Sequence, residues 1–191
     1  MGRNLGKAAP ILPTLAPIAA TERWLLRAVI GLNLCPFAKA AHTRQQIRYV
    51  VSDATTANEL RADLERELEF LARADAGVVD TTLLIHPRAL TEFNAYNRFL
   101  GDADALIRDL GLEGVLQIAS FHPDYEFADC PPGAIENYSN RSPYPMLHLL
   151  REASIERAIL AFPDASAIYG KNIRTLRDLG HDGWNALWRD E

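Results

Sequence analysis

The chain has 191 residues, of which 48% are hydrophobic and 24% charged, and its formal net charge is −5 at pH 7. This length and balance are typical of one folded globular domain and exclude a chain that is disordered as a whole. The 20 basic residues are scattered, so no nucleic-acid partner is expected. No apolar run approaches the ~20 residues that a membrane helix needs, so no membrane partner is expected either.

The N-terminal residues predict a tail ahead of the domain. Three prolines between residues 10 and 17 interrupt an alanine-rich stretch, which disfavours the helical core of a secretory signal. We therefore predict a flexible tail over residues 1–20 and a single globular domain over residues 21–191.

The first half of the domain predicts two helices with a strand between them. Thr21 suits the N-cap position of the first helix, which is expected to end before Pro36. The β-branched run over residues 47–51 predicts a strand. Thr55 or Thr56 is expected to cap the second helix, in which leucines recur at helical spacing: Leu60, Leu64, Leu68 and Leu71.

Two further strands are predicted over residues 81–85 and 115–121, and each is followed by a His-Pro pair, beginning at His86 and at His122. The segment between them predicts a helix over residues 91–110, with a glycine near its middle as a candidate break.

A loop of about twenty residues follows the third strand, which is far longer than the usual connection of about four to six residues. Pro145 is then expected to open a fourth helix, because the apolar residues from Met146 to Ala153 form a stripe at helical spacing. Residues 172–179 and 184–188 predict two short helices at the C-terminus.

Strands that alternate with helices predict an α/β fold, with a small, mainly parallel sheet of about three strands flanked by helices. Ligands of such sheets bind beyond the carboxyl ends of the strands. Asp53, His86 and His122 follow the three predicted strands and are therefore expected at one edge of the sheet.

The long loop and the segment after it supply the best candidate for a ligand site. Tyr125 lies in the loop, and Asn140, Arg141 and Ser142 come just before the expected fourth helix. A helix N-terminus favours an anion, and the planar fork of Arg141 suits a carboxylate or a phosphate. The loop therefore predicts a site for an anionic small molecule.

In the expected fourth helix, His148 and Glu152 are four residues apart and would lie on one face. They could be two metal ligands, a base with its orienting carboxylate, or an ordinary surface pair. Together with His122 and Arg141, His148 is expected to line one concave, partly open pocket.

The two cysteines offer a weaker candidate. Cys35 and Cys130 each precede a proline and form no CxxC pair, which favours a reducing compartment and hence a cytoplasmic location. Cys35 could be a catalytic nucleophile, but it follows a predicted helix C-terminus, which does not stabilise a thiolate, and free cysteines often pack as small hydrophobes.

Three motifs, GLNLCPFA (31–38), GVLQIASFHPDYEFAD (114–129) and ENYSNRSPYPMLHLLRE (136–152), together resemble a bacterial family of domains of unknown function. The resemblance spans about residues 24–179 and implies a soluble, stand-alone bacterial protein. The family has no assigned reaction, so no catalytic role carries over. The segment over residues 167–172 lacks the family's Ile-Pro turn. The positions that match the motifs are Cys35, Pro36, Phe37, His122, Pro123, Tyr125, Asn140, Arg141, Ser142, Tyr144, His148, Arg151 and Glu152.

Three hypotheses follow from these residues. The first is a metal- or anion-dependent small-molecule enzyme with His122, His148, Glu152 and Cys35 as catalytic candidates. The second is a non-catalytic binding or accessory protein that holds an anionic ligand or a partner segment. The third is that the polar side chains between His122 and Glu152, which we call the polar block, only satisfy the hydrogen bonds of the long loop. The sequence does not specify a metal, a cofactor or an oligomeric state. In the first two hypotheses the ligand contacts are Tyr125, Asn140, Arg141, Ser142 and Arg151.

Overall fold

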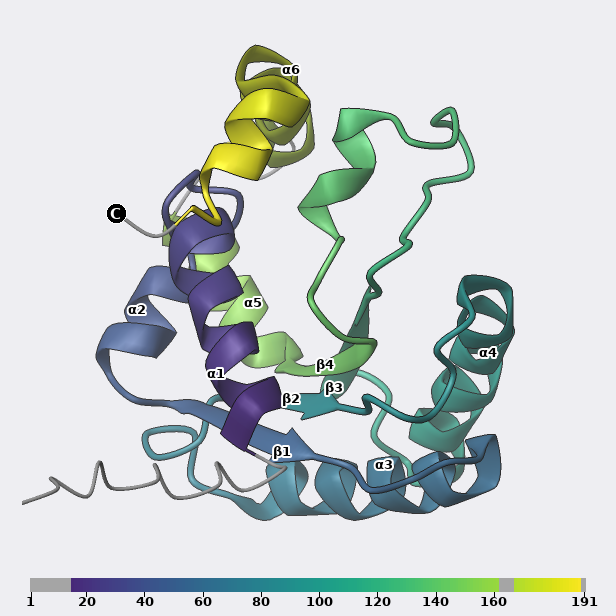
Figure 1. The fold of residues 1–191 in the computed structure, drawn as a ribbon. Helices are drawn as coiled ribbons and strands as arrows, with labels where there is room; N and C mark the ends of the chain where they lie inside the picture. Colours follow the sequence, from purple (N-terminus) through teal and green to yellow (C-terminus); the bar gives the residue numbers. More distant parts are fainter. Residues whose placement is uncertain (1–14, 162–166, 190–191) are drawn as a thin grey trace, which may run out of the picture.

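A computed structural model describes residues 15–161 and 167–189, and in this part the chain forms a four-stranded sheet with helices on both faces (Figure 1). The order of the strands is β1-β2-β4-β3. Their bounds are β1 (Ile47–Val51), β2 (Thr81–Ile85), β3 (Leu116–Phe121) and β4 (Met146–Arg151).

The α/β class is confirmed, but the expectation of about three mainly parallel strands is wrong. β1 and β2 are parallel, whereas β4 is antiparallel to both of its neighbours, β2 and β3. The three strands predicted from the sequence do run in one direction, because β1 is parallel to β2, and β2 and β3 are both antiparallel to β4, which lies between them. The difference therefore comes from one strand that the sequence pattern did not reveal.

That strand, β4, lies where the fourth helix was predicted. Leu147 and Leu149 face one side of the sheet, while Met146, His148 and Leu150 face the other. Because a central strand is covered on both faces, its apolar residues form a nearly continuous run, and such a run cannot be distinguished from a helical stripe by periodicity. Tertiary packing decides the structure here.

Helices α3 and α4 cover one face of the sheet, and α1, η1 and α6 pack on the other (Figure 1). A positive φ of 62° at Gly180 kinks α6, at the place where two separate short helices were expected. None of the helices in residues 15–161 and 167–189 is long and apolar enough to cross a membrane. The helical bounds are α1 (Leu15–Trp24), η1 (Leu25–Ile30), α2 (Ala38–Thr43), α3 (Ala57–Arg73), α4 (Phe93–Asp109), η2 (Ile135–Ser139), α5 (Glu152–Ala161) and α6 (Ala167–Ala186).

Two helix starts test the capping expectations. Thr56 caps α3 through a complete capping box with Glu59, as its position predicted. Thr21 does not cap a helix, because α1 already begins at Leu15 and Thr21 is buried within it. Residues 15–20, expected in the tail, are thus helical, and the rest of the predicted tail lies outside the described residues.

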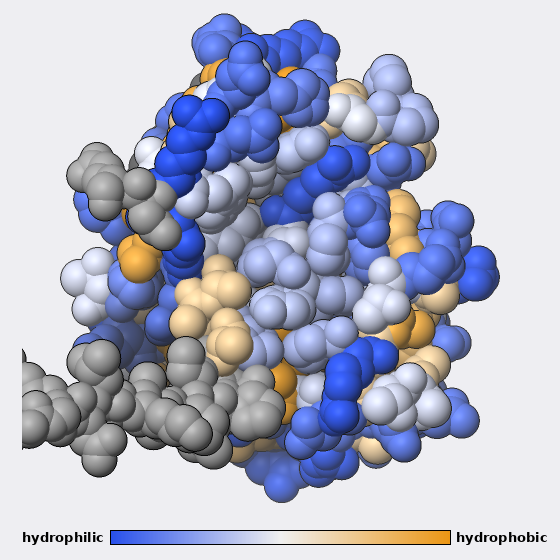
Figure 2. Space-filling view, viewed as in Figure 1, coloured by the Kyte–Doolittle hydropathy of each residue, from blue (hydrophilic) through white to orange (hydrophobic). Residues whose placement is uncertain are grey.

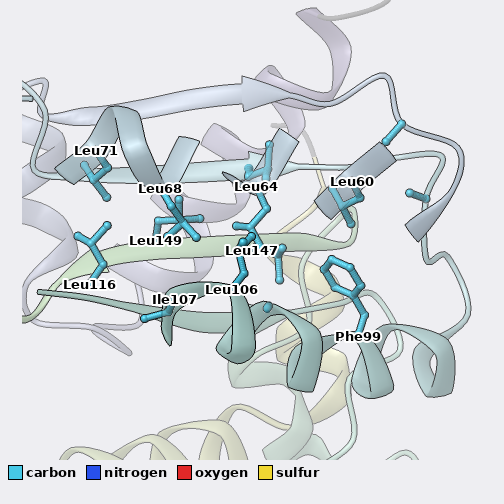
Figure 3. Packing of buried hydrophobic residues seen from close by; sticks show 14 of the residues in the cluster. Leu60, Leu64, Leu68, Leu71, Phe99, Leu106, Ile107, Leu116, Leu147 and Leu149 are labelled. Carbon is cyan, nitrogen blue, oxygen red and sulfur yellow. The ribbon is translucent and has the colours of Figure 1, made fainter. Parts of the chain in front are cut away.

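The leucine stripe of α3 packs against β4 and α4 to form the larger of two apolar clusters (Figure 3). Its side chains point toward Leu147 and Leu149 on the sheet and toward Phe99 and Leu106 on α4. The second cluster lies on the opposite face and joins the sheet to α1, η1 and α6 through Trp24, Leu83, Ile85, Met146, Leu176 and Trp184.

Tyr96 on α4 forms hydrogen bonds to backbone groups of both β3 and β4 where the two strands pair. Its buried hydroxyl donates to the carbonyl of Met146 and accepts from the N–H of Phe121, both at 2.9 Å. Tyr96→Phe leaves both backbone groups unpaired, so we expect the free energy of unfolding to fall by about 2 kcal/mol. Urea denaturation measures this loss. Tyr169→Phe, on an exposed ring, is the control, and an equal effect of the two changes would contradict the prediction.

Candidate functional site

The carboxyl ends of β1, β2 and β3 lie at one edge of the sheet, as expected, because the three strands run in the same direction. The rings of His86 and His122 both contact Tyr96, with centroid distances of 5.8 and 5.1 Å. Asp53, at the same edge, binds Arg88 through its carboxylate at 2.9 Å. The predicted edge is therefore present, and Asp53, His86 and His122 all lie at it.

His122 is fully engaged by the backbone. Its Nδ1 accepts from the N–H of Asp124 at 3.0 Å, so the ring proton is on Nε2, which donates to the carbonyl of Leu90 at 3.2 Å. The side chain is buried, and burial lowers its pKa, so the ring is neutral. Both nitrogens thus hold the turn after β3, and neither is left for a metal or a substrate.

His86 is also buried. Its Nδ1 donates to the carbonyl of Ala89 at 2.9 Å, and its Nε2 has no partner among the described residues. Burial lowers the pKa of His86 to about 4, which keeps the ring neutral. The stacked Tyr96 ring covers it. His86 therefore packs as part of the interior at this edge.

Three of the predicted ligand contacts form hydrogen bonds within the loop or between the loop and β3. Asn140 donates to the carbonyl of Ser120 at 3.0 Å, Ser142 donates to the carbonyl of Tyr144 at 2.6 Å, and the hydroxyl of Tyr125 lies 3.2 Å from that of Ser120. These bonds satisfy polar groups that a long, half-buried loop would otherwise leave unpaired. For Tyr125, Asn140 and Ser142, the third hypothesis fits best, in which the polar side chains only satisfy the loop's hydrogen bonds.

Arg151, another predicted ligand contact, lies at the end of β4 and binds the end of α3. Its guanidinium donates to the carbonyls of Leu71 and Ala74, both at 2.7 Å, and to that of Val79 at 3.2 Å. A cation at this position satisfies carbonyls that the helix leaves free and opposes the negative end of its dipole. Arg151 therefore joins helix to sheet.

The predicted pair of His148 and Glu152 is wrong, because the two residues do not share a helix. His148 is in β4, and Glu152 begins α5. Positions four apart along a strand are separated by about 13 Å, which is too far for a base and its orienting carboxylate. The expectation of a helix N-terminus beside Arg141 fails for the same reason, since β4 follows there.

Arg141 instead lies in an open hollow of about 670 Å³, which we call the Arg141 hollow. Its Nε donates to the carbonyl of Tyr125 at 3.1 Å, and its guanidinium lies 4.5 Å from the centre of the Tyr138 ring. Figure 2 shows the face of the molecule that carries the hollow, below α6 and beside α1. The lining residues are Ala19, Ala20, Arg23, Trp24, Pro123, Tyr138, Arg141, Ser142, Pro143, Trp184 and Trp188.

His148 lines a second cavity of about 340 Å³, which we call the sheet cavity and which lies between the sheet and the helices α1, η1, α2 and α5. Its Nε2 lies 2.7 Å from the hydroxyl of Thr81, which itself donates to the carbonyl of Leu149 at 2.6 Å. Burial lowers the pKa of His148 to about 4. The ring is therefore neutral near pH 7.

Cys35 also lines the sheet cavity, and its surroundings differ from the expectation. It lies just before α2, and hydrogen bonds from the N–H groups of Phe37 and Ala38 partly offset the effect of burial on its thiol. Burial dominates and raises the pKa of Cys35, so the thiol stays protonated at neutral pH. This environment does not activate a nucleophile. Cys130 is likewise a free, partly buried thiol.

The expected convergence of His122, Arg141 and His148 on one pocket is wrong. Arg141 lines the hollow, His148 lines the sheet cavity, and His122 lines neither. In the described part of the chain, no group of three or more histidine, cysteine, aspartate or glutamate side chains is placed to hold a metal ion.

The aromatic walls of the hollow were not predicted from the sequence. Trp24 comes from α1 and Trp184 from α6, at opposite ends of the chain, so no local motif connects them. Tyr138 lay within a recognised motif, but its contact with Arg141 depends on the path of the loop. The one available signal was that all three tryptophans of the chain fall outside the predicted strands.

Comparison with known proteins agrees with the resemblance inferred from the three motifs. No curated protein and no solved structure matches the chain. The model of a family described as "Protein of unknown function (DUF1415)" matches residues 16–186, which include the whole lining of the sheet cavity and all of the lining of the Arg141 hollow except Trp188. The chain therefore belongs to this family of unknown function.

Proposed function

We propose that this protein binds a small anionic molecule with a flat ring in the Arg141 hollow. The observation that carries the proposal is the state of Arg141: its guanidinium is held in place by Tyr125 and Tyr138 but forms no ion pair with any carboxylate of the described residues. A fixed, partly buried cation without a counter-charge is suited to accept one from a ligand.

The walls of the hollow indicate the rest of the ligand. The ring of Tyr138 contacts the guanidinium, and the buried rings of Trp24 and Trp184 and the partly buried ring of Trp188 also line the hollow. Aromatic walls bind planar rings by stacking and edge contacts, and a volume of about 670 Å³ is within the usual range of about 300–1,000 Å³ for small-molecule sites. An aromatic carboxylate or phosphate ester combines the two features.

The lining favours binding over catalysis. The described residues that line the Arg141 hollow include no carboxylate, imidazole or thiol that could act as a base or nucleophile, and the hydroxyl of Ser142 already donates to the carbonyl of Tyr144. The non-catalytic hypothesis is thus better supported than the enzyme hypothesis. Two free cysteines support the proposal of a reducing, cytoplasmic location, and the motif resemblance supports a bacterial origin.

A fluorescence titration tests the proposal, because all three tryptophans of the chain line the hollow. We expect 2-naphthoate to bind the wild type about tenfold more tightly than uncharged 2-naphthamide, which is the difference that one charge-assisted contact supplies. Arg141→Gln should remove this preference, and Arg141→Lys should retain part of it.

Arg108→Gln is the matched control, because Arg108 is an exposed arginine of α4 and does not line the hollow. It should bind both probes as the wild type does. The proposal fails if the wild type binds the acid and the amide equally well, or if Arg141→Gln leaves the affinity for naphthoate unchanged while the melting temperature shows a folded protein.

A further inference from the structure

We propose that the sheet cavity is a second ligand site, which takes a mostly apolar small molecule and recognises a hydroxyl or N–H group of that molecule through Nδ1 of His148. This inference goes beyond the binding of an anion in the Arg141 hollow. The two cavities share only Trp24 among their described lining residues, so they can be tested separately.

The floor of the sheet cavity is the face of the sheet opposite α3 and α4. It consists of alternate residues of the three neighbouring strands: Leu83 of β2, Ala119 and Phe121 of β3, and His148 and Leu150 of β4. Successive side chains of a strand point to opposite faces, which is why these residues meet on one side.

The roof comes from the helices. Leu25 and Val29 of η1, Ala38 and Ala41 of α2, and Ile155 of α5 line it. The enclosure is apolar except for Gln117 and a polar end, which consists of Asp80, Thr81, His148, Arg151 and Ser154. Its volume of about 340 Å³ suits a small ring compound. Gln117 of β3 lines the cavity and is exposed to solvent, which indicates that the cavity reaches the surface at that point.

The hydrogen bonds around His148 define its protonation. The hydroxyl of Thr81 has one proton, which it donates to the carbonyl of Leu149 at 2.6 Å. The contact of 2.7 Å with His148 must therefore run from Nε2–H to the hydroxyl oxygen. Nδ1 is then the unprotonated nitrogen and an acceptor, and no residue of the described chain donates to it.

Nδ1 of His148 is not among the fully buried unpaired atoms of the described residues, so it is open to the cavity that His148 lines, where a ligand can reach it. Neighbouring side chains on the same face, Met146 and Leu83, are apolar and buried, so packing alone would be served by a leucine or methionine at position 148. Because burial also keeps the ring neutral, the site favours an uncharged donor over an anion. A hydroxyl or N–H group on the ligand would satisfy Nδ1.

The other polar side chains at the polar end of the cavity are already paired. Ser154 donates to the carboxylate of Asp80 at 2.5 Å, and Arg151 donates to the carbonyls at the end of α3. The Cys35 thiol is protonated and fits an apolar wall. His148 is thus the side chain within the enclosure that retains hydrogen-bonding capacity for a ligand.

The cavity exists because several lining positions have only a methyl group, and one of them offers a matched test. Ala119 lies directly opposite His148 in the β3–β4 register, and both line the cavity. Ala119→Leu adds three carbons at the floor beside the imidazole. This change fills the space but leaves the His148–Thr81 contact and the Arg141 hollow untouched.

The experiment compares 2-naphthol, which has a hydroxyl donor, with 2-methylnaphthalene, which has none, by ligand-observed NMR. We expect the wild type to bind naphthol about threefold to tenfold more tightly, the effect of one neutral hydrogen bond. In long-range ¹H–¹⁵N spectra, naphthol should shift the Nδ1 resonance of His148, whereas methylnaphthalene should leave it nearly unchanged.

Two variants locate the effect. His148→Phe should bind both probes equally, and His148→Asn, which retains an acceptor near the position of Nδ1, should keep part of the preference for naphthol. Ala119→Leu should weaken the binding of both probes at least tenfold. If a variant does not fold, the probe pair and the ¹⁵N shift in the wild type still decide the question.

Arg141→Gln separates this proposal from the previous one, because it should abolish the preference for naphthoate and leave naphthol binding unchanged. Ala119→Leu should have the opposite pattern. The inference is overturned if the wild type binds neither probe, if it binds both equally, or if naphthol binding depends on Arg141 and not on His148.

Discussion

Between pH 7 and pH 5, the free energy of unfolding is expected to fall by about 4 kcal/mol, with His86 and His148 contributing about 2 kcal/mol each. Burial lowers the pKa of both residues from 6.5 to about 4. The unfolded chain therefore binds protons more readily than the folded chain. This contribution to stability is complete above about pH 6.5, is lost as the pH falls, and is fully lost below about pH 4.

Chemical denaturation at pH 7, 6 and 5 measures this loss. His148→Phe should reduce the pH dependence by about half, because it removes one of the two histidines whose pKa is lowered to about 4. Only the slope with pH is compared, since the substitution also changes packing. Asn97→Gln, at an exposed position of α4, adds and removes no ionisable group and should leave the slope as in the wild type. A wild-type stability that is constant from pH 7 to pH 5 would show that neither histidine is buried in neutral form.

Arg151→Met is expected to lower the free energy of unfolding by about 3 kcal/mol, because it leaves the carbonyls of Leu71, Ala74 and Val79 without their donor. These carbonyls end α3 and begin the connection to β2, so the loss should also loosen that junction. Methionine keeps most of the length of the side chain, which isolates the effect of the guanidinium.

Arg141→Met is the matched control, ten positions earlier in the same motif. Arg141 donates to one carbonyl and contacts one ring at a partly exposed position, so its loss should cost less than about 1 kcal/mol. Urea denaturation of both variants gives the comparison. Equal losses would contradict the assignment of Arg151 to the scaffold and of Arg141 to the ligand site.

The two arginines show what a single sequence can and cannot predict about the site. Both belong to the same motif, and both were expected to contact a ligand. Arg151 faces the end of α3 because β4 is a strand, whereas Arg141 lies in the loop before it. Which carbonyls or rings surround an arginine depends on segments far away in the chain, and no local spacing contains that information.

The histidines show the same limit. His86 and His122 were expected at one edge of the sheet. They lie there because strands that run in the same direction have their carboxyl ends at the same edge. Their availability for chemistry could not be predicted, because it depends on backbone groups such as the N–H of Asp124 and the carbonyl of Leu90. The role of His148 required knowledge of the hydroxyl of Thr81, which lies in a neighbouring strand.

By itself, the sequence determined the local features: the capping box of Thr56, the leucine stripe of α3, the three strands that begin at Ile47, Thr81 and Leu116, and membership of a family of unknown function. Each of these depends on a periodicity or on a contact within a few residues. Such features can therefore be recognised in the sequence without knowledge of the rest of the chain.

Only the tertiary structure decided that residues 146–151 form a strand, and that Arg141 and His148 line two different cavities. The insertion of β4 between β2 and β3 buries both of its faces, and this burial removes the alternation by which a strand is recognised. The Arg141 hollow likewise requires Trp24 and Trp184 to meet. Such contacts are made by packing between distant segments, which leaves no periodic trace in the sequence.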